Sequence, residues 1–222
     1  TGSLHRVAGF AGRDDMSKGL LVKRVRDPAI CSAHSRDRAE LRTELGLPAG
    51  RRIIGIFGGV SERKNAPMIW EAMQAAGIEA DLLLAGSLSA GVSAWVESIE
   101  PTPGGEVITR QGFLSNVVLD QLVAASDVAA LVMTNNGPSG IMGKALAAGV
   151  PVVTAGSEVR AREVRATDGG EIADVAAVSI GAALDRALAR DPDAPSRSTV
   201  PLATAESFAA GILGARPRTK RA

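Results

Sequence analysis

Cysteine, histidine and tyrosine are scarce in this 222-residue chain, which has one cysteine, two histidines and no tyrosine. A single cysteine, Cys31, excludes an intrachain disulfide and a zinc site built on paired cysteines, and it favours a reducing, cytoplasmic setting. The histidines, His5 and His34, belong to no recognisable catalytic motif, so we interpret both as ordinary surface residues. No Ser/His/Asp or Cys/His arrangement is readable. The sequence therefore assigns no catalytic residue, no metal and no cofactor.

An excess of one charge sign and long apolar runs are also missing. The 25 basic and 24 acidic residues leave a formal net charge of +1, which gives no reason to expect a nucleic-acid partner. Apolar runs are broken well before the roughly 18 residues that cross a bilayer, and residues 1–15 lack a signal-peptide pattern. We therefore expect a globular protein with no integral membrane segment, as the 45% hydrophobic and 22% charged residues also indicate.

Apolar strands alternate with helical segments along the middle of the chain. The pattern predicts strands at 52–57, 81–85, 107–109, 128–133 and 150–154, and helices at 65–73, 92–99, 115–125 and 139–148. Near-continuous apolar strands of this kind imply a parallel sheet with helices on both faces, a doubly wound α/β fold. Asp127 is interpreted as a strand-start residue that makes a structural hydrogen bond.

The flanks of this region are less regular. We divide the chain into a tail or connector at 1–37, a Rossmann-like domain at 38–190, and a C-terminal helix with a basic tail at 191–222. One short strand is expected at 20–25, and further helices from about Ser35, at 178–189 and at 205–213. The basic tail, ARPRTKRA, is interpreted as a solvated chain end.

The usual nucleotide-binding signatures are absent, since there is no GxGxxG and no GxxxxGK[ST]. A Gly58-Gly59 pair does follow the first strand of the middle region, and Lys64 comes shortly after it. Backbone amides at the glycines and the Lys64 ammonium suit a phosphate, and Arg63 would serve equally well. The alternative is that the glycine pair and the lysine are only structural.

A second glycine-bearing loop, Gly137-Pro138-Ser139-Gly140, leaves the carboxyl end of a strand and opens a helix. Free amides near Ser139, Gly140 and Ile141 would suit an anion or a sugar hydroxyl. The alternative is that Ser139 merely caps the helix while the following alanines permit close packing. Gly112 closes a third strand at the same edge, so one ligand could touch all three loops.

Several segments resemble one known family when they are taken in order. These are LRTELGLP, IIGIFGGVSERKNAPMIWEAM, DLLLAG, VITRQGFLS, LVAASDVAALVM and GKALAAGVPVVT. Over residues 38–188 they resemble the C-terminal half of group 1 glycosyltransferases with the GT-B fold. The resemblance implies a single Rossmann-like half that carries the nucleotide-sugar donor site of a retaining hexosyltransferase. It also implies an acceptor-binding N-terminal domain or partner chain, which 222 residues cannot hold as well.

The family's site residues match this sequence only in part. Lys64 matches a lysine that contacts the donor's diphosphate, but Gly59 stands where an arginine is expected. Asn136 and Lys144 stand where the family has two glutamates. Asn136 can hydrogen-bond a sugar hydroxyl, whereas the Lys144 ammonium cannot accept from ribose hydroxyls and either attracts a phosphate or lies outside the site.

The predicted donor site combines these loops with the loop at 110–113, which in the family lies against the base. Its residues are Gly58, Gly59, Lys64, Gly112, Phe113, Asn136, Ser139, Gly140 and Ile141. Three hypotheses remain open. They are the donor half of a glycosyltransferase, a non-catalytic half-transferase that acts as a binding or partner module, and an unrelated doubly wound enzyme.

Overall fold

The centre of the molecule is a six-stranded, all-parallel sheet. The computed structural model describes residues 7–10, 22–26, 28–191 and 201–213. His5, the beginning of the strand expected at 20–25 and the basic tail lie outside these residues. The strand order is β5-β4-β3-β6-β7-β8. The strands are β3 (Arg52–Phe57), β4 (Ala80–Gly86), β5 (Val107–Gln111), β6 (Val128–Val132), β7 (Val152–Ala155) and β8 (Gly170–Ala173).

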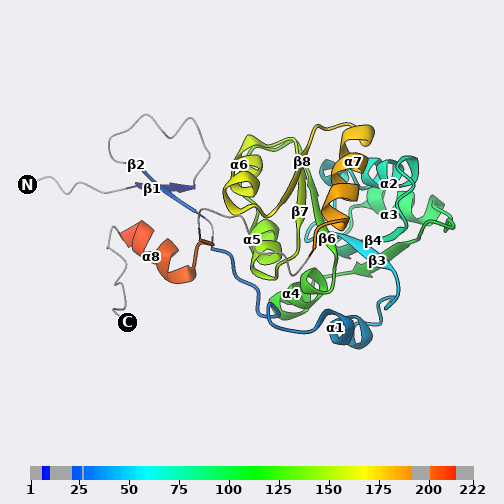
Figure 1. Cartoon of the computed structure of the whole chain (residues 1–222), viewed down its shortest axis with the longest axis horizontal. Coiled ribbons are helices and arrows are strands. Elements are labelled where there is room, and N and C mark those ends of the chain that lie inside the picture. The colour runs from blue at the N-terminus through cyan, green and yellow to red at the C-terminus, as the bar shows by residue number, and fades with distance from the viewer. Residues whose placement is uncertain (1–6, 11–21, 27, 192–200, 214–222) are drawn as a thin grey trace, which may run out of the picture.

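Helices cover both faces of this sheet (Figure 1). One face packs against α2 (Ala66–Ala75), α3 (Ala90–Ser98) and α7 (Ala177–Leu188). The other packs against α1 (Arg38–Glu44), α4 (Asn116–Ala124), α5 (Gly140–Ala147) and α6 (Glu158–Thr167). The predicted doubly wound α/β fold is therefore confirmed.

The apolar strand runs are the reason that the sequence predicts this sheet well. Every residue of β4 and the last five of β3 are buried, as expected for strands covered on both faces. The helix α6 and the strand β8 were not predicted from the sequence. Three arginines and two glutamates in the ten residues of α6 obscure its apolar face, and β8 is only four residues long and begins at a glycine.

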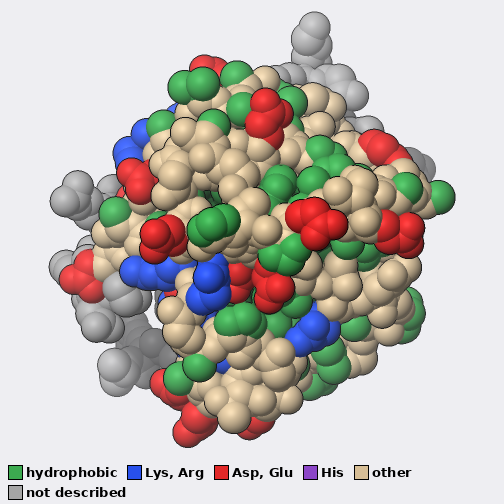
Figure 2. All heavy atoms as spheres, turned by 90° about the vertical axis from the view of Figure 1, so that its right-hand side faces the viewer, with side chains coloured by type: hydrophobic (Ala, Val, Ile, Leu, Met, Phe, Trp, Pro, Cys, Tyr) green, Lys and Arg blue, Asp and Glu red, His purple; other side chains and the backbone are tan. Residues whose placement is uncertain are grey.

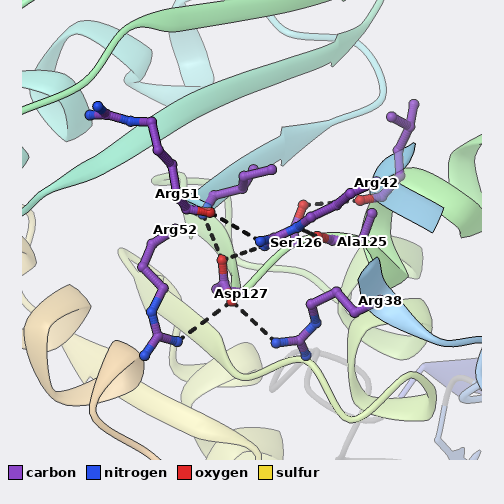
Figure 3. Close-up of polar contacts among 9 residues, drawn as sticks. Arg38, Arg42, Arg51, Arg52, Ala125, Ser126 and Asp127 are labelled. Carbon is purple, nitrogen blue, oxygen red and sulfur yellow. Dashed lines mark hydrogen bonds and ion pairs between the residues drawn. The ribbon is translucent and has the colours of Figure 1, made fainter. Parts of the chain in front are cut away.

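Asp127 ties three elements together at the amino edge of the sheet (Figure 3). Its carboxylate accepts a hydrogen bond from the Ile53 amide at 2.7 Å and pairs with Arg42 at 2.6 Å. Arg38 and Arg52 approach the same carboxylate at 3.2 and 3.5 Å. Since Asp127 and Arg42 are both buried, the structure confirms the predicted strand-start role and adds a buried ion pair between α1 and the start of β6.

A smaller unit lies beside the main sheet. It contains β1 (Val7–Phe10) and β2 (Val22–Val25), which pair in parallel, and α8 (Ala205–Leu213), which contacts both strands (Figure 1). The two connections to the main domain touch each other. The Ala29 amide donates to the Ala203 carbonyl at 2.7 Å, and Arg26 donates to the Pro201 carbonyl at 2.8 Å.

Acidic and basic side chains lie close together on the face shown in Figure 2, without a broad patch of one sign. This mixture agrees with the nearly balanced composition of the chain. Within the part of the chain that the structure describes, no helix is long and apolar enough to cross a membrane.

Candidate functional site

The order of the strands marks one place at the carboxyl edge of the sheet. The chain runs outward from β3 to β4 and β5 and then returns to β6 on the other side of β3. Helix-bearing loops therefore diverge above the carboxyl ends of β3 and β6, which is where open α/β sheets bind ligands. The Gly58-Gly59 turn follows β3, and the loop at 133–139 follows β6. Both predicted loops thus meet at this switch point.

Three glycines form a row along part of this edge. Gly58, Gly86 and Gly112 follow or end β3, β4 and β5, and all have positive φ angles, of 83°, 133° and 125°. The Gly112 amide donates to the Gly86 carbonyl at 3.1 Å. A Cβ atom on Gly86 would lie 2.0 Å from the Gly58 carbonyl oxygen. The three strand ends therefore pack too closely for a side chain at the central position.

Lys64 lies under the Gly58 turn with only 8% of its surface exposed. Its ammonium donates a hydrogen bond to the Phe57 carbonyl. Burial, with a smaller effect from the nearby charge of Arg63, lowers the pKa of Lys64 to about 8. No carboxylate among the described residues pairs with Lys64, so an anion at this turn would stabilise its charged form.

Arg63 reaches across the switch point. Its Nη1 donates to the side-chain oxygen of Asn135 at 3.0 Å. Asn65, which has a left-handed φ of 51°, makes a second bridge by donating to the Val132 carbonyl at 3.1 Å. Two side chains that follow β3 therefore hold the end of β6 and its loop in place.

Arg160 is the residue at this edge that the sequence analysis missed. It is fully buried in α6 and donates five hydrogen bonds, to the carbonyls of Met133, Asn135, Gly137 and Ala155 and to the Thr154 hydroxyl. Burial, with a smaller effect from the nearby charge of Arg63, lowers the pKa of Arg160 to about 10. The guanidinium thus shapes the loop after β6 from beneath. The strand-glycine-helix repeat, continued at Gly156, was the signal that could have revealed α6.

The predicted residues of the second loop lie at the start of α5. Ser139 is its N-cap but makes no side-chain capping bond. The backbone amides of Gly140 and Ile141 have no hydrogen-bond partner within the described residues. The side-chain oxygen of Asn136 accepts from the Ser157 hydroxyl at 3.2 Å and the Val159 amide at 3.4 Å, which leaves only its Nδ2 group to donate to a ligand.

Phe113 stands outside the core, with 98% of its surface exposed. It directly follows Gly112, whose amide is tied to the end of β4. The glycine row therefore presents this aromatic ring at the β5 end of the edge. Arg110 is turned toward the loop after α1 and donates to the carbonyls of Leu45 and Gly46 at 3.0 and 2.8 Å.

Lys144 does not face the glycine row but pairs with Asp120 of α4. The same carboxylate accepts from the Ser32 amide and hydroxyl at 2.7 and 2.8 Å. Lys144 and Asp120 thus clamp the segment that enters the domain onto α4 and α5. This geometry supports the alternative that places Lys144 outside a ligand site.

A pocket of about 480 Å³, partly open to solvent, lies between α5, α6 and the entering segment. Its lining is mostly apolar and includes Met142, Leu146 and Val159, with the ion pair between Arg26 and Glu163 at its border. No group of three or more His, Cys, Asp or Glu residues in the described ranges is placed to hold a metal ion.

Sequence comparisons identify no relative, because no protein-family model and no curated protein matches the chain. Comparison with solved structures does find similar folds. WaaG, a glycosyltransferase of lipopolysaccharide biosynthesis, is 17% identical with a TM-score of 0.61, over 77% of this chain and 48% of that one. A HepE structure from Anabaena that contains UDP-glucose is 18% identical with a TM-score of 0.58, over 75% and 47%.

The C-terminal domain of the group 1 glycosyltransferase LpcC from Francisella tularensis is matched over most of its own length. It is 14% identical with a TM-score of 0.58, over 70% of this chain and 84% of that domain. By contrast, the chain spans about half the length of WaaG and HepE. Residues of the main sheet and its helices therefore have the fold of one half of a GT-B group 1 glycosyltransferase, the half represented by the C-terminal domain of LpcC.

Proposed function

We propose that the chain is the donor-binding half of a glycosyltransferase and binds a nucleotide sugar across the switch point. One observation carries this proposal. Lys64 lies buried beneath the Gly58-Gly59 turn, where no side chain blocks a ligand, and has no carboxylate partner among the described residues. Uncompensated cations beside open backbone amides favour the binding of a phosphate group.

The loops suggest how the parts of such a ligand lie. The diphosphate would approach Gly58, Gly59 and Lys64 and the open amides at Ser139, Gly140 and Ile141. The exposed ring of Phe113, beside Gly112, offers a surface on which a base can stack. Asn136 would donate from Nδ2 to a sugar hydroxyl, because its side-chain oxygen is already bonded.

The solved structures support a uridine nucleotide as the first ligand to test, since HepE contains UDP-glucose and UDP. Transfer of the hexosyl group with retention of configuration would also need an acceptor site. We therefore propose that an N-terminal domain or partner chain supplies it, and that the protein works in the cytoplasm. The domain boundaries at residues 37 and 190 stay predictions.

Calorimetric titration tests the proposal directly. UDP-glucose, GDP-mannose and ADP-glucose are titrated into the folded protein, and we expect at least one to bind. Lys64→Met should weaken that ligand by about 1.5 to 3 kcal/mol, the usual contribution of a hydrogen bond to a charged group. Lys144→Met is the matched lysine control and should leave the affinity unchanged. The absence of binding to all three, with the wild-type protein folded, would reject the donor site.

A second function is favoured by one observation. Both carboxylates expected in the family are replaced, and Lys144 is engaged with Asp120. A half-transferase without catalysis, acting as a binding module, would tolerate both changes. Finding a Rossmann-like domain encoded in frame directly upstream would contradict this alternative.

A further inference from the structure

The switch point carries an exposed cation beside the buried Lys64. Lys64 and Arg160 are buried, whereas Arg63 is exposed. Arg63 lies close enough to the other two to lower the pKa of each. All five N–H groups of Arg160 are bonded to protein oxygens, so of the two arginines only Arg63 can donate to a ligand.

Arg63 is the cation that is free to meet a further anion. Of its nitrogens, only Nη1 has partners among the described residues, with Asn135 Oδ1 at 3.0 Å and Met133 Sδ at 4.0 Å. Because the Arg63 side chain is exposed, Nε and Nη2 remain available to a ligand. The bond to Asn135 fixes the guanidinium beside the loop that also carries Asn136, whose Nδ2 is open. Nε and Nη2 present the paired geometry that binds a carboxylate through two hydrogen bonds.

The loop after β6 contains no acidic residue to repel such a group. From Met133 to Gly140 it carries only neutral side chains. Arg160 donates to three carbonyls of this loop from beneath and adds a second positive charge there. A negatively charged sugar would therefore meet attraction on both sides of the loop.

We propose that the donor's sugar carries a carboxylate, as a hexuronic acid does, and that Arg63 binds this carboxylate. The inference rests on the proposed function, because it assumes a nucleotide sugar at the switch point. It adds the substrate class, which the arrangement of loops alone does not give.

Matched donor pairs test the inference. UDP-glucuronate is compared with UDP-glucose, GDP-mannuronate with GDP-mannose, and UDP and GDP serve as references in the same calorimetric titrations. The wild-type protein should bind the uronate of a pair about ten-fold or more tighter than the neutral sugar, as expected for a hydrogen-bonded pair of charges. Arg63→Gln should remove this preference and leave the affinity for the bare nucleoside diphosphate within about three-fold. Arg165→Gln, at an exposed arginine on α6, should change nothing.

Two results overturn the inference while leaving the proposed function intact. The first is equal affinity for the uronate and its neutral counterpart. The second is an equal loss for uronate, neutral sugar and nucleoside diphosphate in Arg63→Gln, which would assign Arg63 to the diphosphate. Failure of every nucleotide to bind the folded protein would instead reject the proposed function, and this inference with it.

Discussion

Replacing Arg160 by methionine should destabilise the domain far more than the same change at another arginine of α6. Met133, Asn135 and Gly137 have no other partner for their carbonyl groups among the described residues. The Ala155 carbonyl still accepts a hydrogen bond from the Met133 amide at 3.2 Å. The change therefore leaves the buried Met133 carbonyl without a donor, while the loop carbonyls of Asn135 and Gly137 gain access to water.

The magnitude follows from two opposing contributions. Five hydrogen bonds from a charged donor contribute at least about 1.5 kcal/mol each. Burial of the guanidinium, together with the nearby charge of Arg63, lowers the pKa to about 10 and costs about 3 kcal/mol. With partial recovery of hydrogen bonds by water in the loop, we expect a net loss of about 3 kcal/mol in the free energy of unfolding. For a domain of this size that corresponds to a fall in Tm of about 6 to 12 °C.

Urea denaturation followed by circular dichroism measures the loss, and thermal unfolding provides a second measurement. Arg165→Met is the control, because within the described ranges Arg165 pairs only with the exposed Glu158 at 2.8 Å and should contribute less than about 1 kcal/mol. The free energy of unfolding of Arg160→Lys should lie between those of Arg160→Met and Arg165→Met, since one ammonium cannot reach all the carbonyls. Equal stability of Arg160→Met and Arg165→Met would refute the assigned role of the guanidinium.

Three further perturbations test other parts of the structure. Because burial lowers the pKa of Lys64 from 10.5 to about 8, UDP affinity should fall as the pH rises through 8 in the wild type but not in Lys64→Met. Between about pH 8 and 10.5 Lys64 is protonated in the unfolded chain but largely neutral in the folded protein. The free energy of unfolding should therefore rise with pH over this range. If neither UDP affinity nor the free energy of unfolding changed with pH in this way, Lys64 would not be buried as described. Phe113→Ala should weaken UDP binding by about 1 to 3 kcal/mol through lost stacking, with Tm unchanged because the ring is 98% exposed. Asp120→Asn should speed amide hydrogen exchange at Ser32 without altering UDP affinity, and unchanged exchange would show that the Asp120 carboxylate does not hold the Ser32 segment in place.

The sequence predicts the fold well where burial alone decides the structure. β3 and β4 are recognisable because nearly all their residues are apolar and buried. α6 is not, because its arginines are satisfied by contacts that the linear sequence does not show. Arg160 is fully buried against carbonyls up to 27 residues away, and no hydrophobic pattern can indicate such a cation.

The candidate site shows the same division. Gly58 and Gly112 are predictable because tight strand ends need a positive φ angle. The partner of Lys144 is not predictable, since Asp120 lies one strand and one loop earlier and comes into reach only when α4 and α5 pack together. The side-chain oxygen of Asn136 is likewise occupied by α6, an element that the sequence analysis did not place.

The contact between the entering and leaving segments has a mechanical consequence. Ala29 and Ala203 are hydrogen-bonded, and Arg26 spans from Glu163 of α6 to the Pro201 carbonyl. The unit of β1, β2 and α8 is thus held by a double tether at a single place. Any movement of that unit away from α6 would therefore have to break the ion pair between Arg26 and Glu163.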